Sequence, residues 1–294
     1  MVHYLHNYRM HCINGFFLNH GLPCERCQHG NFWPAFRTGC WHDSRLISGW
    51  MSLITRRIRH LGVFSKVSAW IALSEAHRNK HVQFGLPASR LHVVRHFFES
   101  SQTPPPVCPQ GNILYLGRLS SEKGLEYLLR AWRLVESRGR KLVLAGDGPD
   151  SARLKSLAAA LKLKHVEFLG FVSLGEHRAL WAQTSFSVIP SIWHEPFGRS
   201  LLESWGHGRT FVASRLGGLA ELVKEGHDGF LAEPFSETSL ASQIQILIDS
   251  PQTCTKMGEA GLVRVREEFH RQVWLSQINE VFGRALPAAS RKAA

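Results

Sequence analysis

Two carboxylates on either side of a tight turn are the residues of this chain best suited to chemistry. Glu195 and Glu203 are separated by a Pro-Phe-Gly turn and by the start of an apolar helical pattern. The apolar run at residues 186–190 precedes them and predicts a buried strand. Glu195 would then lie at the carboxyl end of that strand and Glu203 on the first turns of the helix, where open α/β sheets bind ligands. Because an ionised carboxylate only accepts hydrogen bonds, the pair suits the hydroxyl groups of a sugar or a ribose.

A second group of charged and glycine residues follows an earlier strand pattern. Residues 113–117 are apolar and end in Gly117, and Arg118 and Lys123 flank the turn that opens the next helical pattern. Two cations beside the free backbone N–H groups of a helix start suit a diphosphate. Taken alone, the two side chains also fit a solvated surface pair. Gly146, in a Gly-Asp-Gly-Pro stretch, likewise fits an ordinary turn when taken alone.

The order and separation of these motifs resemble the donor-binding half of retaining glycosyltransferases of family 4. The family pattern reads G-R-L-x-x-x-K-G, then G-x-G-P, then E-P-F-G…E, then G-G…E…G…G. The matching positions are Gly117, Arg118, Leu119, Lys123 and Gly124; Gly146, Gly148 and Pro149; Glu195 to Glu203; and Gly217, Gly218, Glu221, Gly226 and Gly229. The resemblance extends over nearly the whole chain. It implies the GT-B fold, an α/β fold of two Rossmann-like domains whose donor is a nucleotide-activated sugar.

The resemblance also implies catalytic roles for four residues. Arg118 and Lys123 match the cations that neutralise the leaving diphosphate, so that no cofactor is required for catalysis. Negative charge that develops on a diphosphate needs preorganised positive charge. Glu195 matches the residue near the donor sugar hydroxyls, and His6 resembles the histidine of the acceptor-domain loop that contacts the donor sugar. Without the resemblance, His6 also fits a satisfied polar residue at the end of a strand.

A donor-binding set follows from the same resemblance. Glu203 matches the residue that accepts hydrogen bonds from the ribose hydroxyls, and Arg118 and Lys123 bind the diphosphate. The other members would act through the backbone, either by presenting N–H groups or by letting the nucleotide approach closely. They are Gly117, Gly146, Phe197, Gly198 and Arg199.

A run of prolines divides the chain. Residues 103–106 contain three consecutive prolines, which favour a stiff, extended linker. We therefore expect a partial acceptor domain at residues 1–105, a donor-binding domain at 106–270, and a helix at 271–294 that returns to the first domain. Strand and helix patterns alternate after the prolines, which predicts a doubly wound parallel sheet. The first domain is shorter than the family's and is expected to be incomplete, with an exposed sheet edge that favours aggregation.

Four cysteines are concentrated near the start of the chain. Cys24 and Cys27 have the C-x-x-C spacing of a zinc ligand pair, and Cys12 and Cys40 lie on either side of them. The flanking spacings differ from the usual pattern, in which both halves are C-x-x-C. Ordinary reduced cysteines, a structural zinc site and redox chemistry therefore all remain open, whereas disulfides are not expected in a cytoplasm.

The charge of the chain favours anionic partners. Lys and Arg exceed Asp and Glu by enough to give a formal charge of +12. The cations are scattered and no nucleic-acid-binding motif is evident, which argues against nucleic acid. The densest group, Arg56, Arg57, Arg59, His60 and Lys66, alternates with apolar residues. This pattern fits either a core-facing helix with a solvated basic face or a helix that docks on an anionic membrane surface.

These observations favour a retaining glycosyltransferase. It would move a hexose from a UDP- or GDP-sugar to a cell-envelope polysaccharide or a lipid-linked acceptor. The alternative is a truncated, catalytically weak nucleotide-binding subunit that needs a partner chain. The sequence has neither a run of about 18 apolar residues nor a signal-peptide pattern, so a cytoplasmic location is expected, peripheral on the inner face of the membrane.

Overall fold

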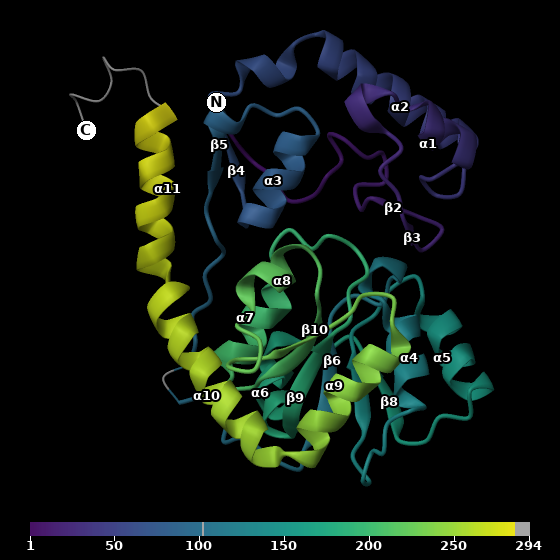
Figure 1. Cartoon of the computed structure of the whole chain (residues 1–294), viewed down its shortest axis with the longest axis vertical. Coiled ribbons are helices and arrows are strands. Elements are labelled where there is room, and N and C mark those ends of the chain that lie inside the picture. Colours follow the sequence, from purple (N-terminus) through teal and green to yellow (C-terminus); the bar gives the residue numbers. More distant parts are fainter. Residues whose placement is uncertain (102, 286–294) are drawn as a thin grey trace. The chain divides into compact units, whose positions relative to one another are not determined.

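Short apolar strands alternate with helices through most of the chain, as the sequence predicts. The structure, a computed structural model, describes residues 1–101 and 103–285 (Figure 1). Contacts within the chain divide it into two units. The first contains residues 1–96, the segment Trp193–Phe197 and the chain from Gln272 onwards, and the second contains Phe97–Ile192 and Gly198–Arg271. The predicted C-terminal segment, 271–294, lies partly outside the described residues.

The first unit is built on a small parallel sheet. Its strands are β1 (Val2–Tyr4), β2 (Leu18–Asn19), β3 (Leu22–Pro23), β4 (Ala69–Ala72) and β5 (Leu91–Val93), and its helices are α1 (Trp33–Thr38), α2 (Arg45–His60), α3 (Glu75–Gln83) and α11 (Arg271–Ala285). The parallel strands are ordered β1-β4-β5. Ile278 and Val281 of α11 pack against Ile71 and Val94 on one side of this sheet. Burying these apolar side chains attaches the last helix to the first unit.

The second unit carries a six-stranded parallel sheet. Its strands are β6 (Asn112–Leu116), β7 (Leu142–Ala145), β8 (Val166–Gly170), β9 (Thr184–Ile189), β10 (Phe211–Ser214) and β11 (Phe230–Ala232). Its helices are α4 (Leu125–Trp132), α5 (Ser151–Ala160), α6 (Leu174–Ala182), α7 (Arg199–Gly206), α8 (Gly217–Leu222), α9 (Glu237–Asp249) and α10 (Pro251–Glu268). The strand order is β11-β10-β9-β6-β7-β8. The chain thus runs outward from β6 to β8, returns to β9 beside β6, and runs outward again on the other side. This confirms the predicted doubly wound sheet.

Periodic burial explains how the helices of the second unit cover this sheet. Leu125, Leu128, Leu129 and Trp132 of α4 recur at helical spacing and are all buried in the main core. The central strand β9 is buried along its whole length, as expected of a parallel strand covered on both faces.

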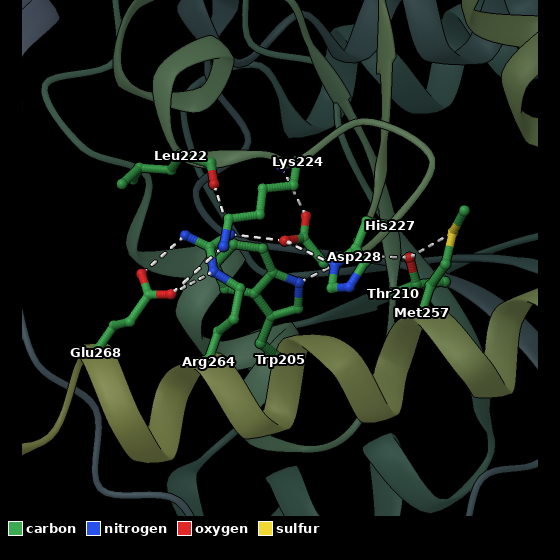
Figure 2. A network of polar contacts seen from close by, with 9 residues as sticks. All are labelled: Trp205, Thr210, Leu222, Lys224, His227, Asp228, Met257, Arg264 and Glu268. Atoms are coloured by element: carbon green, nitrogen blue, oxygen red, sulfur yellow. Dashed lines mark hydrogen bonds and ion pairs between the residues drawn. The ribbon is translucent and has the colours of Figure 1, made fainter.

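A network of charged groups, buried around Arg264 and Asp228, joins α10 to the end of α8 and the loop after it (Figure 2). Arg264 of α10 donates to the Asp228 carboxylate at 2.7 Å and to the Leu222 carbonyl at 2.8 Å, and forms two 3.0 Å hydrogen bonds with Glu268. Its guanidinium lies over the ring of Trp205. Burial lowers the pKa of Arg264, but the hydrogen bonds to Glu268 and Asp228 outweigh it and raise the pKa above its ordinary value, so the side chain stays charged. The other residues of the network are Thr210, Lys224, His227 and Met257.

A second buried arginine holds the proline run on the second unit. Arg209 is fully buried, and its guanidinium donates to the carbonyl oxygens of Pro105 at 2.6 Å and Pro106 at 2.7 Å. It also donates to the carbonyls of Thr184, Trp181 and His207. Burial lowers the pKa of Arg209 to about 10, which leaves it cationic at neutral pH. Carbonyl dipoles rather than carboxylates therefore compensate this charge.

No described helix combines the length and the apolar character that crossing a bilayer requires.

Candidate functional site

Two glycine-containing loops lie side by side at the carboxyl ends of β6 and β7. The backbone N–H of Leu119 donates to the Asp147 carbonyl at 3.0 Å, and that of Asp150 donates to the Leu119 carbonyl at 3.0 Å. Gly146 has a φ of +139°, and a Cβ at this position would lie 1.9 Å from the carbonyl oxygen of Gly117. Only glycine allows this contact, so the Gly-Asp-Gly-Pro stretch joins the two loops and does not merely turn the chain.

A third loop, after β9, meets the loop after β6. The backbone N–H of Ile192 donates to the Glu122 carbonyl at 3.0 Å. Gly124 has a φ of +69°, and a Cβ there would lie 1.9 Å from the carbonyl oxygen of Pro190. β6 and β9 are adjacent strands. After β6 the chain continues toward one edge of the sheet, and after β9 it continues toward the other edge, so these loops border the topological switch point. Ligands of open α/β sheets bind at this point.

The structure places the two predicted diphosphate-binding cations at this point. Arg118, on the loop after β6, is exposed, and its carbonyl oxygen accepts a 2.7 Å hydrogen bond from the Tyr115 hydroxyl. Lys123 is half-buried at the end of the 3-10 turn η4 (Ser121–Lys123), directly before α4. Next to it, Glu122 is buried and accepts a 2.6 Å hydrogen bond from the hydroxyl of Ser120. Sequence reasoning missed Glu122, because a single carboxylate in a turn carries no distinctive signal.

Glu203 lies on α7, one turn after its start. Gly198, with a φ of +103°, precedes this helix, and Arg199 is its exposed first residue. The carboxylate of Glu203 keeps 27% of its side chain accessible and lies 3.6 Å from Nδ1 of His177 on α6. Burial raises the pKa of Glu203, while His177 and Arg199 oppose that rise. A half-buried acceptor of this kind suits a hydroxyl group. His177 was missed, because nothing in the sequence of α6 distinguishes it.

The remaining predicted site residues belong to the first unit. Glu195 is buried within the segment Trp193–Phe197. The hydroxyl of Ser74 donates to the Pro196 carbonyl at 2.7 Å and accepts from the N–H of His77, so it joins this segment to the start of α3. The side chain of Phe197 is buried, with its ring edge-on to that of His96, which leaves only its backbone for a ligand.

His6 lies just beyond the end of β1. Its side chain is exposed, and its ring stacks on that of Tyr4 with 4.9 Å between the ring centroids. This position contrasts with that of three fully buried histidines of the same unit, His11, His77 and His81. Sequence reasoning considered His11 only as a possible metal ligand beside the cysteines, and it missed His77 and His81, although these two stand four residues apart on α3 and therefore share a face.

The four cysteines near the start of the chain converge on one small cavity. Cys12, Cys24, Cys27 and Cys40 line a space of about 10 Å³. Burial and the neighbouring thiols raise the pKa of Cys27 to about 12 and that of Cys40 to about 11. Among the described residues, however, no group of three or more His, Cys, Asp or Glu side chains is arranged so that it could hold a metal ion. A structural zinc at these cysteines stays a prediction, and elemental analysis of the purified protein is its direct test.

Comparison with known proteins decides the family. The model of the family described as glycosyl transferases group 1 matches residues 106–264, more than half of the chain. The chain belongs to this family. The matched region contains the three loops at the switch point and helix α7, and it leaves out His6. The narrower assignment to family 4 stays a prediction.

Individual relatives agree with this assignment. An uncharacterized glycosyltransferase of Methanocaldococcus jannaschii is 40% identical over 131 residues, which are 44% of this chain and 33% of the relative. The lipopolysaccharide core biosynthesis glycosyltransferase LpsD of Rhizobium meliloti is 26% identical over 77% of this chain and 67% of its own. Among solved structures, that of Anabaena HepE in complex with UDP-glucose has a TM-score of 0.67 and 25% identity, over 74% of this chain and 64% of HepE.

These matches confirm the predicted fold class, the α/β fold of GT-B glycosyltransferases. The chain spans less than two thirds of the length of most of its similar relatives, for example 33% of one and 39% of another.

Proposed function

We propose that this chain is the donor-binding part of a retaining glycosyltransferase that moves a hexose from a UDP- or GDP-sugar. The observation that carries the proposal is that two predicted motifs, at residues 117–124 and 146–149, meet the loop after β9 at the switch point between β6 and β9, the position where such sheets bind nucleotides. HepE, which was solved with UDP-glucose, supports a nucleotide-sugar donor.

The proposed roles follow from the chemistry of each group. Arg118 and Lys123 neutralise the diphosphate as the bond to the sugar breaks, so transfer needs no divalent metal. Glu203 accepts hydrogen bonds from the ribose hydroxyls, and Glu195 and His6 contact the donor sugar. Gly117, Gly146 and the turn at 197–199 supply backbone contacts.

The proposed acceptor is a cell-envelope polysaccharide or a lipid-linked sugar. LpsD, which is named for lipopolysaccharide core biosynthesis, supports this class of acceptor. An acceptor of this class also fits an enzyme that works beside the membrane, on the cytoplasmic side where nucleotide sugars are made.

A thermal-shift panel of UDP, GDP, ADP and their sugars tests the donor site. A nucleotide present at 100 times its Kd should stabilise the native state by about 2.7 kcal/mol and raise the melting temperature. Glu203→Ala should weaken that nucleotide by roughly 1–3 kcal/mol, because the ribose hydroxyls lose their acceptor. Glu259→Ala, on the exposed side of α10, is the matched control. Unchanged affinity in Glu203→Ala would reject the ribose contact.

A sugar-transfer assay tests the two cations. Arg118→Ala combined with Lys123→Ala should abolish transfer and leave the melting temperature within a few degrees, since both side chains contact solvent. Arg133→Ala with Lys164→Ala removes two exposed cations elsewhere on the same unit and should leave activity unchanged. Addition of EDTA should also leave transfer unchanged. Wild-type activity in the first double variant would contradict the proposed neutralisation of the diphosphate.

A further inference from the structure

Helix α2 of the first unit has its large apolar side chains in solvent. Leu46 is 84% exposed, Trp50 66%, Leu53 63% and Leu61 56%. Their spacing of three, four and eight residues places them on one face of the helix. Three isoleucines, Ile47, Ile54 and Ile58, extend this face and are 37–46% exposed. We call these seven residues the α2 apolar face. Contiguous exposed apolar surface of this kind marks an interaction site.

The inward face of the same helix carries small residues and one apolar side chain, Met51, which packs against Phe32 and Ala35. Ser48 and Ser52 are buried, and the hydroxyl of Ser52 donates to the Ser48 carbonyl at 2.6 Å. Ser48 Oγ accepts a 2.9 Å hydrogen bond from the N–H of Trp41. Gly49 lies against Phe36, because a Cβ at this glycine would stand 2.8 Å from the phenyl ring. The helix is therefore reversed relative to an ordinary surface helix, whose apolar stripe faces the core. This excludes the core-facing helix that was one of the two sequence interpretations.

Positive charges predominate along and after α2, although the exposed Asp43 stands two residues before the helix. Residues 44–74 contain Arg45, Arg56, Arg57, Arg59 and Lys66 and not a single Asp or Glu. Arg45, Arg56 and Arg57 are exposed on α2 itself. A second copy of this face would bring like charges together, which disfavours a symmetric dimer. An anionic surface with an apolar interior complements both the cations and the apolar residues.

An open groove lies beside this face. It has a volume of about 740 Å³ and lies among the 3-10 turn η1 (Gln28–Gly30), α1 and α2. Phe32, Trp33 and Phe36 line it together with Arg56 and Arg59. Aromatic rings beside guanidinium groups suit the boundary between lipid headgroups and acyl chains, where Trp and Arg side chains are stable.

We propose that the α2 apolar face docks this protein on an anionic phospholipid membrane. The apolar side chains insert below the headgroups, and the arginines contact lipid phosphates. Membrane docking rests on the proposed function for the class of acceptor. An enzyme held on the bilayer finds a lipid-linked acceptor by diffusion in two dimensions rather than three.

Flotation with lipid vesicles tests the proposal, with no nucleotide present. Vesicles of phosphatidylglycerol and phosphatidylcholine should bind the full chain, and vesicles of phosphatidylcholine alone should bind it much less. Raising the salt from 0.1 M to 1 M shortens the screening length from about 10 Å to about 3 Å and should weaken binding. Equal binding to both kinds of vesicle, or to neither, would overturn the proposal.

Two variants separate the apolar and the charged contributions. Leu46→Ser with Trp50→Ser and Leu53→Ser should lower the partition constant by at least about tenfold, because the inserted apolar area is lost. Arg56→Gln with Arg57→Gln should lower it roughly fivefold per cation removed. Phe171→Ser with Leu174→Ser, at positions 81% and 84% exposed on the second unit, is the matched control and should bind as the wild type does.

Two further readouts distinguish membrane docking from a folding defect and from self-association. The serine variant should keep its melting temperature and its nucleotide-induced shift, which shows that fold and donor site are intact. If nucleotides give no shift in any variant but vesicle binding follows the pattern above, docking holds and the proposed donor site fails. Light scattering that shows a dimer disrupted by the serine variant would assign the face to a second copy and overturn membrane docking.

Discussion

The two units bury polar groups in opposite ways. In the second unit two buried polar clusters are built on charged arginines: Arg209 contacts five carbonyl oxygens, and Arg264 contacts two carboxylates. In the first unit, which also buries Glu195, the buried polar cluster is neutral: His11, His77 and His81 form a chain of imidazoles with 3.0 Å between successive nitrogens. Guanidinium groups stay charged over the usual pH range, whereas imidazoles gain charge below pH 7, so the two units should respond differently to acid.

A hydrogen bond from the backbone of Leu73 determines the tautomers of the three histidines. The N–H of Leu73 donates to Nδ1 of His77, so the proton of His77 is on Nε2, which donates to Nε2 of His81. His81 then donates from Nδ1 to Nε2 of His11. The proton of His11 is therefore on Nδ1, a buried atom for which the described part of the chain provides no acceptor. The chain is complete only while all three rings are neutral.

Lowering the pH should give the largest effect and should unfold the first unit before the second. Burial is the main cause that lowers the pKa of His11 and His77 to about 2 and that of His81 to about 3. The unfolded chain binds these protons near pH 6.5 and the folded chain does not, so stability is full above pH 6.5 and falls as the pH drops below it. Three groups give a slope of about 4 kcal/mol per pH unit. Acid titration followed by amide hydrogen exchange of each unit would measure it.

Two histidine variants sharpen this prediction. His11→Phe should reduce the slope by about a third, because it removes one titrating group; it also exchanges the unpaired N–H of His11 for an unpaired Nδ1–H of His81. His20→Asn, at an exposed position with positive φ that Asn tolerates, should leave the slope unchanged. Equal acid sensitivity of the two units in the wild type would contradict the comparison.

Arg209→Met should give the next largest effect and should act on the second unit alone. The change removes the guanidinium that donates to five carbonyl oxygens, at an expected cost of about 3–5 kcal/mol. These are the carbonyls of Pro105, Pro106, Trp181, Thr184 and His207. Urea denaturation would measure this cost, with the exposed Arg133→Met as the matched control. An unchanged midpoint would mean that water or a rearranged backbone replaces the guanidinium.

Ser74→Ala should give the smallest effect on stability, at the junction between α3 and the Pro196 segment. Loss of the helix cap should cost about 1 kcal/mol, measured by thermal unfolding. Because the hydroxyl also contacts the Pro196 carbonyl, we expect transfer activity to fall more than this loss of stability explains. Ser44→Ala removes a similar cap from α2 and should leave activity unchanged. Equal activity in both variants would limit Ser74 to capping.

Sequence patterns predicted the second unit well because its signals are local. Apolar strands that end in glycine and cation motifs, such as Gly117 and Arg118 after β6, indicated both the parallel sheet and the edge that carries the loops. The contacts that join those loops depend on long-range backbone approach, as between Gly124 and Pro190, and no local pattern contains them. Partners such as the half-buried His177 and the buried Glu122 were missed for the same reason.

The first unit was harder to predict because several polar side chains are buried in it while several large apolar side chains are exposed. Three histidines are buried, and the large apolar residues of α2 are exposed. Periodicity correctly indicated an amphipathic helix, but it does not say which face contacts the protein. Ser48 and Ser52 decide this, because α1 and the loop before α2 pack closely onto them.

Because of this reversed packing, one set of α2 residues attaches the helix to the protein and another set determines its surface chemistry. The helix is attached through Ser48, Gly49, Met51 and Ser52. The identities of Leu46, Trp50 and Leu53 therefore contribute little to the native state. Substitutions on the outer face can accumulate over evolution without a loss of stability, whereas the small inner residues should tolerate almost none. If α2 docks on membranes as proposed, descendants of this protein can adapt to a different lipid composition while the fold that carries the proposed donor site stays the same.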